Sequence, residues 1–210
     1  MNILSTAYLG NIQYFTKLLN TDEGPVIDLA ENYQKQSYRN RCDILGANGV
    51  ITLIVPVFKK SGSKTSVKDT LIDYSKPWQR QHWISIVSAY RNSPYFDYYT
   101  DDFFSFFMRR EKYLKDWNGK LQDTIFEIIG ISPSIKYSDT YIVPRNEDND
   151  FRHSISSKPR LRQQDDEFCP HPYYQVFSDK FGFTPNLSIL DLLFCEGPES
   201  ASVIKASVKK

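Results

Sequence analysis

The sequence predicts an α/β fold, in which a mixed β-sheet is flanked by helices and followed by a polar loop and a C-terminal helical segment. Three observations predict this class. The chain opens with a strand-like stretch and then a helical one, an Asn-Gly pair lies between two β-rich runs, and two later stretches carry apolar residues at helical spacing. Together these patterns are typical of one α/β domain.

The N-terminal stretch should form a strand, a helix and a second strand. Residues 2–9 are strand-like, and Asn11 is a suitable N-cap for a helix over residues 12–19, whose apolar positions follow helical spacing. Gly24-Pro25 then breaks the chain before a buried strand at residues 26–30. Ligands gather at the carboxyl end of such strands in open α/β sheets.

A hairpin and two helices should follow. Residues 39–45 and 50–57 flank the Asn-Gly pair and should pair antiparallel. Ser75-Lys76-Pro77 should start a helix, and Asn92-Ser93-Pro94 should end it. The longest helix should be capped at residues 100–102 and end at Gly130, because Phe and other apolar residues recur at three-, four- and seven-residue spacing.

The remainder divides the chain into three parts. A last strand is expected at residues 134–143, which closes a core domain of residues 1–143. Residues 144–167 are strongly polar and should form a loop or a lid, either disordered or ordered by a ligand. Residues 168–210 should pack on the core and contain a helix that Ser188 and Asp191 begin with a capping box.

Composition limits the classes of partner. Lysine plus arginine (26) nearly balance aspartate plus glutamate (25), so no global field attracts nucleic acid or an anionic membrane, and any anion site must be local. No run approaches the about 20 apolar residues of a spanning helix, and no signal peptide is apparent, so we expect a cytoplasmic protein. The scattered Cys42, Cys169 and Cys195 should be reduced thiols, and no metal or cofactor is predicted.

The main candidate for a ligand site is the run of amides, tyrosines and cations at residues 31–41, which lies between two apolar, strand-like segments. A rigid core would therefore present its side chains to a small-molecule or sugar-linked substrate, which could carry phosphate. Tyr8 and Tyr38 would stack on a sugar, Asn32 would donate hydrogen bonds to a developing oxyanion, and Arg39 with Arg152 or Lys158 would hold a phosphate. The predicted substrate-binding residues are Tyr8, Asn32, Gln34, Tyr38, Arg39, Arg152 and Lys158.

Candidate catalytic residues are His82, Asn40 and Arg41. Acyl transfer needs a base, for which His82 is the candidate, and donors to the developing oxyanion, for which Asn40 and Arg41 are candidates. A lone histidine beside an apolar stripe is more often structural, and the cations after residue 150 are as readily a solvated loop. Nucleotidyl or phosphoryl transfer, and a non-catalytic module that binds a glycan precursor or a partner enzyme, remain open alternatives.

Several short motifs occur in order along most of the chain. They are residues 31–41, Val55-Pro56-Val57, Lys68-Asp69, Pro77-Trp78, His82-Trp83, Ala89-Tyr90, Ser93-Pro94-Tyr95-Phe96, Asp150-Phe151-Arg152, Gln175-Val176-Phe177 and residues 186–193. With these motifs the chain resembles the WbqC-like protein family, and is most similar to its members from Bacteroides-like bacteria. The opening differs from the usual Gln-Pro-x-Tyr-Leu-Pro-x-x-Gly-Tyr-Phe signature: Tyr8, Leu9, Tyr14 and Phe15 are kept, whereas Ser5, Thr6 and Gln13 replace the Gln-Pro and the glycine.

The resemblance implies a place in surface polysaccharide (O-antigen) synthesis, because family members lie among genes of that pathway. It also implies a transferase, since transfer of glycine to a sugar has been suggested for some members. The family supplies no established catalytic residues to carry over, so the roles given above rest on the residues alone.

Overall fold

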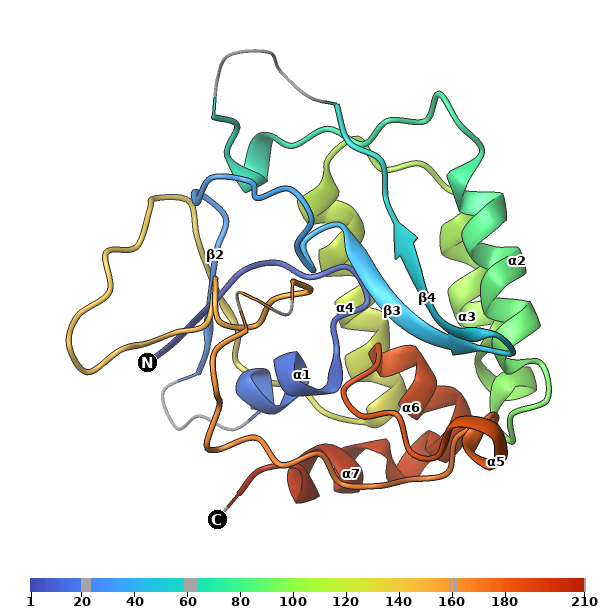
Figure 1. Ribbon diagram of the computed structural model, residues 1–210. Helices are drawn as coiled ribbons and strands as arrows, with labels where there is room; N and C mark the ends of the chain where they lie inside the picture. The colour runs from blue at the N-terminus through green and yellow to red at the C-terminus, as the bar shows by residue number, and fades with distance from the viewer. Residues whose placement is uncertain (20–23, 59–63, 159, 161, 210) are drawn as a thin grey trace.

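The predicted α/β class is confirmed, with parallel and antiparallel strands and helices around them (Figure 1). The computed structural model describes residues 1–19, 24–58, 64–158, 160 and 162–209. The two kinds of strand pairing form separate sheets. Four strands form a parallel sheet in the order β5-β2-β1-β6, and β3 and β4 form an antiparallel pair beside it.

The parallel sheet is built from short strands: β1 (Asn2–Leu4), β2 (Val26–Asp28), β5 (Lys136–Ser138) and β6 (Asn149–Asp150). The first three are shorter than the predicted strands at 2–9, 26–30 and 134–143. At β2 the reason is local, because the Asp28 carboxylate accepts the backbone N–H groups of Ala30 and Glu31, which turns the chain out of the sheet. Helix α1 (Ile12–Leu19) joins β1 to β2 and starts as predicted, with Asn11 Oδ1 accepting the Tyr14 N–H at 3.0 Å.

The predicted hairpin is confirmed as β3 (Arg41–Gly46) and β4 (Gly49–Ile54). The turn consists of Ala47 and Asn48, and the next residue, Gly49, has a φ of 111°, which a side chain would disfavour. On the inner face of the hairpin, Cys42, Ile44 and Leu53 join the core.

The single long helix predicted from residue 100 to Gly130 is wrong. The structure has α3 (Phe96–Phe107) and α4 (Leu114–Ile129), and they follow α2 (Trp78–Tyr90). The chain between α3 and α4 is extended instead, because two backbone hydrogen bonds hold it. Leu114 donates its N–H to the Thr70 carbonyl, and Ile72 donates its N–H to the Lys112 carbonyl. The run of charged side chains in this stretch offers no apolar face to continue the helix. Gly130 ends α4 in the left-handed conformation, as predicted.

The C-terminal helical segment is confirmed and covers one side of the core. It contains α5 (Ser178–Phe181), α6 (Ile189–Glu196), the short 3-10 helix η3 (Gly197–Glu199) and α7 (Ser200–Ala206). Ser188 caps α6 as predicted, through Leu190. The capping-box role predicted for Asp191 is wrong, since its buried carboxylate accepts hydrogen bonds from Tyr90, Tyr173 and Gln175.

Residues 144–167, expected to be a polar loop or a lid, contribute a strand to the sheet. Within this segment β6 pairs with β1, and the chain then crosses the carboxyl edge of the sheet with Arg152 buried (Figure 1). Residues 159 and 161 lie outside the described part of the chain. A second 3-10 helix, η1 (Val67–Asp69), contacts α4 on the opposite side of the same edge.

Candidate functional site

The order of the strands creates a switch point next to the first strand. From β1 the chain moves to β2 and then β5 on one side, whereas β6 lies on the other side of β1. In open α/β sheets, ligands bind outside the carboxyl ends of the strands at such a point. Here the carboxyl ends bring Ser5, after β1, close to Asp150 and Arg152, at the end of β6.

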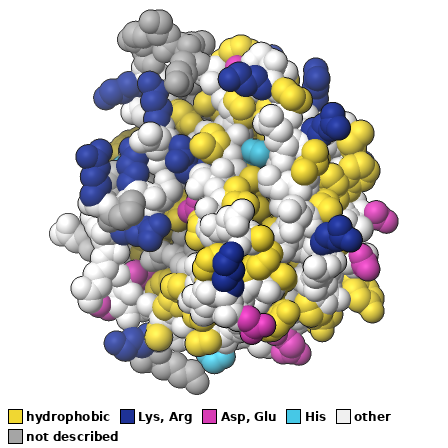
Figure 2. Space-filling view, turned by 45° about the vertical axis from the view of Figure 1, so that its right-hand side comes forward, with side chains coloured by type: hydrophobic (Ala, Val, Ile, Leu, Met, Phe, Trp, Pro, Cys, Tyr) yellow, Lys and Arg dark blue, Asp and Glu magenta, His cyan; other side chains and the backbone are white. Residues whose placement is uncertain are grey.

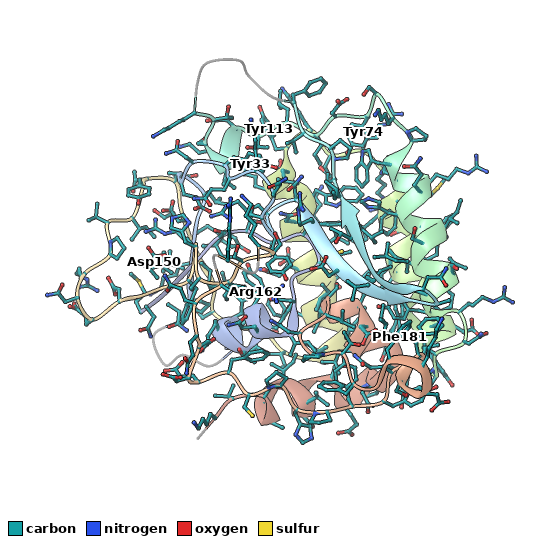
Figure 3. All side chains as sticks on the ribbon, in the orientation of Figure 1. Tyr33, Tyr74, Tyr113, Asp150, Arg162 and Phe181 are labelled. Atoms are coloured by element: carbon teal, nitrogen blue, oxygen red, sulfur yellow. The ribbon has the colours of Figure 1, made fainter. Side chains whose placement is uncertain are left out.

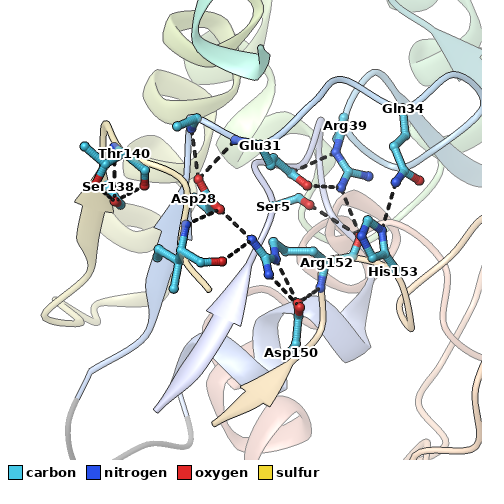
Figure 4. Close-up of polar contacts among 12 residues, drawn as sticks. Ser5, Asp28, Glu31, Gln34, Arg39, Ser138, Thr140, Asp150, Arg152 and His153 are labelled. Carbon is cyan, nitrogen blue, oxygen red and sulfur yellow. Dashed lines mark hydrogen bonds and ion pairs between the residues drawn. The ribbon is translucent and has the colours of Figure 1, made fainter. Parts of the chain in front are cut away.

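Arg152 fills much of this crevice (Figure 4). Its Nη1 lies 2.6 Å from Asp28 Oδ2, and its Nε and Nη2 bind the two carboxylate oxygens of Asp150 at 2.9 and 2.7 Å. The ring of Tyr141 covers the guanidinium. The hydrogen bonds to Asp150 raise the pKa of Arg152. All three guanidinium nitrogens are therefore committed to the protein itself.

A second buried ion pair lies beside the first. Arg39 binds Glu31 through Nε at 2.9 Å and Nη2 at 2.6 Å, and Nη2 also donates to the Arg152 carbonyl. Both partners are 3% exposed or less. Since the two pairs occupy the crevice, the cavity left there has a volume of about 20 Å³. That is room for a water molecule rather than for a substrate.

The structure does not support His82 as a base. Its Nε2 accepts the Ile54 N–H at 3.1 Å, so Nδ1 carries the proton and lies 2.9 Å from the Tyr8 hydroxyl. Burial lowers the pKa of His82 to about 4. Both ring nitrogens are occupied, and Tyr8 is itself fully buried, so this pair links β4, α2 and the loop after β1.

The other predicted residues divide between interior and surface. Asn40 donates to the Val55 carbonyl at 2.8 Å and is buried, whereas Arg41 is half-buried and its Nε has no protein partner. Asn32 and Gln34 are exposed, and Gln34 contacts His153. Tyr38, within the run, lines the small cavity, and Lys158, on the chain after β6, is half-buried. Their functional roles stay predictions.

A larger pocket, which sequence reasoning missed, lies on the same edge of the sheet, between α4 and strands β2 and β5. Its volume is about 300 Å³, at the lower end of the range for ligand sites. The lining combines hydroxyl, amide, carboxylate, ammonium and aromatic groups. It consists of Thr6, Ile27, Leu29, Lys115, Asp116, Gly119, Lys120, Gln122, Asp123 and Tyr137.

Hydrogen bonds to neighbouring side chains hold polar groups of this pocket in place. Gln122 is buried, and its Oε1 lies 3.2 Å from the Tyr14 hydroxyl while its Nε2 lies 3.4 Å from the Tyr137 hydroxyl. Tyr137 is 50% exposed, so one part of its ring faces the opening. Asp123 is exposed, and partial desolvation together with the nearby charge of Glu127 raises its pKa. A carboxylate whose pKa is raised at the wall of a pocket is suited to accept a proton.

Gly119 is the signal in the sequence that could have revealed this pocket. A glycine inside a helix costs stability, and the pair Asn118-Gly119 predicted only a kink. In the structure Gly119 lies on the pocket side of α4, and a Cβ built on it would meet no atom within 4 Å. Packing against the protein therefore does not require a glycine at this position.

Comparison with known proteins identifies the family. The model of the WbqC-like protein family matches residues 6–164. The chain belongs to the WbqC-like family. The chain is also similar to the uncharacterized protein Rv1507c of Mycobacterium tuberculosis, with 25% identity over 224 aligned residues that cover 97% of this chain and 96% of the relative. No solved structure matches.

The larger pocket lies wholly inside the family match, whereas Leu4 and Ser5, which line the small cavity, lie just before it. Across the part of the chain that the structure describes, no helix is long and apolar enough to cross a membrane. Among the same residues, no three His, Cys, Asp or Glu side chains are grouped to hold a metal ion.

Proposed function

We propose that this WbqC-like protein is a transferase of surface polysaccharide (O-antigen) synthesis that binds a sugar in the pocket between α4 and β5. The reaction we favour transfers an acyl or aminoacyl group, such as glycyl, to an amine or hydroxyl of that sugar. The observation that carries the proposal is the chemistry of the pocket at the carboxyl edge of the sheet. The pathway is what the family resemblance implies.

The pocket lining suits a sugar. Carboxylates such as Asp116 and Asp123 would accept hydrogen bonds from sugar hydroxyls. The ammonium groups of Lys115 and Lys120 pair with Asp116 at 2.9 Å and Glu111 at 2.6 Å, and their remaining N–H groups would donate to the hydroxyl oxygens. The half-exposed ring of Tyr137 offers a face for the C–H groups of the sugar ring. A site with few apolar side chains and converging polar groups favours a polyhydroxylated ligand over an apolar one.

Asp123 is the base in this proposal. It would take the proton from the acceptor amine or hydroxyl as that group attacks the donor's carbonyl carbon, after which the donor's leaving group departs and the acyl bond to the sugar is complete. Gln122 and Lys115 line the same pocket and would donate to the carbonyl oxygen as it becomes negative. His82 has only a structural role in this proposal, since both of its ring nitrogens are occupied by hydrogen bonds inside the protein.

The test is a turnover assay by mass spectrometry, with nucleoside diphosphate amino sugars as acceptors and acyl or glycyl thioesters as donors. We expect a product whose mass has grown by the acyl group, and Asp123→Asn should slow its formation by about 100-fold or more. Asp102→Asn, an exposed carboxylate on α3, is the matched control and should leave turnover unchanged. Undiminished turnover in Asp123→Asn would refute the proposed base.

A non-catalytic module that holds a glycan precursor is the second candidate. It is favoured by one observation: the predicted histidine base and the arginines of the crevice are all engaged in contacts inside the protein. In that case a nucleoside diphosphate sugar would raise the melting temperature of the protein, because a ligand that binds only the folded state stabilises it. No acyl donor would give a product.

A further inference from the structure

We infer that a cationic surface formed by Lys35, Lys158 and Arg162 binds a phosphate or diphosphate group of the substrate. The assignment of that group to a sugar-linked substrate rests on the proposed function, but the anion site itself does not. Two segments far apart in the sequence form this surface, namely the polar run after β2 and the chain after β6.

Two contacts hold the two segments together. The Ser157 hydroxyl donates to the Gln36 carbonyl at 2.8 Å, and Gln34 Nε2 lies 3.0 Å from His153 Nδ1. Within the second segment, Arg162 donates from Nε to the Ser156 carbonyl at 2.9 Å. Lys35 therefore lies between two residues that contact the opposite segment, on the same surface as Lys158 and Arg162.

Arg162 also contacts Tyr38, an aromatic residue of the polar run at residues 31–41. It lies close enough to the hydroxyl of Tyr38 to hydrogen-bond it, and Tyr38 itself lines the small cavity at the crevice. Figure 3 shows Arg162 near the centre of the view and Asp150 to its left. The cation therefore lies at the mouth of the crevice rather than on a remote part of the surface.

No carboxylate forms a described ion pair with these cations. Within the described part of the chain, none of these three cations forms an ion pair with Asp or Glu. Lys35 and Arg162 are exposed, and Lys158 is half-buried. Asp43, which Tyr38 contacts as well as Arg162, accepts hydrogen bonds from Thr52 and Tyr38. Figure 2 shows Lys and Arg side chains gathered on the left of the view with few acidic ones among them.

This local excess of positive charge contrasts with the whole chain, whose formal net charge is +1. Cations without a carboxylate partner repel one another until an anion joins them. A guanidinium offers a fork that fits two phosphate oxygens, and an ammonium group serves as a point charge beside it. A phosphoryl oxyanion is the ligand that satisfies both groups.

The position of the surface favours the substrate's own phosphate over a separate polymer or lipid. Thr6 lines both the small cavity beneath the cationic surface and the larger pocket assigned to the sugar. One molecule could therefore reach both sites across the loop after β1. A sugar joined to a phosphate or diphosphate has this combination of a charged and a neutral, hydroxylated part.

The experiment is isothermal titration of the intact protein with inorganic pyrophosphate. Arg162→Ala, and separately the double variant Lys35→Ala/Lys158→Ala, should each weaken binding by about tenfold or more, the scale of one lost charge-assisted hydrogen bond. Arg80→Ala, an exposed cation on α2, is the matched control and should bind as the parent does. Equal loss in the control, or no pyrophosphate binding by the parent, would overturn the assignment.

A second pair of titrations separates this inference from the proposed function. Asp123→Asn should keep its affinity for pyrophosphate while losing affinity for a nucleoside diphosphate sugar. Pyrophosphate binding that depends on Arg162, in a protein without any transferase turnover, would keep the anion site and refute only the enzyme. Arg162-dependent binding to vesicles of phosphatidylglycerol, with no response to pyrophosphate, would refute a substrate site and indicate a lipid-binding surface.

Discussion

Substitution of Gly119 by alanine should change protein stability and ligand binding in the pocket in opposite directions. Glycine in a helix interior is less favourable than alanine by about 0.5–1 kcal/mol, and the added Cβ would meet no atom within 4 Å. Gly119→Ala should therefore raise the free energy of unfolding by about 0.5–1 kcal/mol. For a chain of this size that corresponds to an increase in melting temperature of about 1–4 °C.

The same methyl group would project into the space where we place the sugar. We therefore expect Gly119→Ala to bind nucleoside diphosphate sugars more weakly although it is more stable, and urea denaturation with titration calorimetry would measure both effects. Thr124→Ala, on the same helix but outside the pocket lining, is a control that should leave sugar binding unchanged. A Gly119→Ala protein less stable than the parent would refute the reasoning, because its Cβ would then not occupy open space.

Three further predictions concern the interior. Arg39→Met should destabilise the protein by about 3–5 kcal/mol, because Glu31 would be buried without its partner, and adding Glu31→Gln should recover much of this loss in urea denaturation. His82 has a pKa lowered from 6.5 to about 4, so its contribution to stability is complete above pH 6.5 and falls by about 3 kcal/mol as the pH drops toward 4. His82→Gln should lack this part of the pH dependence, which denaturation at pH 7 and pH 4.5 would reveal as a smaller difference from the parent at the lower pH. Ser188→Ala should cost about 1 kcal/mol by removing the cap of α6, and an unchanged midpoint of unfolding would contradict that role.

Local signals in the sequence predicted the elements whose geometry is set by neighbouring residues. The cap at Asn11, the hairpin turn before Gly49 and the left-handed Gly130 all depend on a few adjacent residues, and all three are confirmed. The break between α3 and α4 could not be predicted in this way. It depends on hydrogen bonds between the extended chain at residues 112–114 and residues 70–72, about 40 positions earlier. The spacing of apolar residues gives no signal of such distant contacts.

The polar run at residues 31–41 shows why a density of hydrogen-bonding side chains does not by itself identify a ligand site. Its strongest groups, Glu31 and Arg39, pair with each other, and the Arg39 carbonyl accepts from Asn118. Buried charge needs such partners, because an unpaired ion in the interior is costly. Polar residues flanked by strands therefore indicate a structural network as readily as a ligand site, and only the tertiary contacts distinguish the two.

The two ion pairs explain how a sheet of such short strands can hold a site in a fixed position. Arg152 joins the ends of β2 and β6 through Asp28 and Asp150, and Arg39 ties the loop after β2 to the Arg152 backbone. Strands of two or three residues provide few ladder hydrogen bonds, so the carboxyl edge depends on these side chains for its geometry. Arg39 and Arg152, which the sequence predicted to bind substrate, therefore fix the geometry of the carboxyl edge through these contacts.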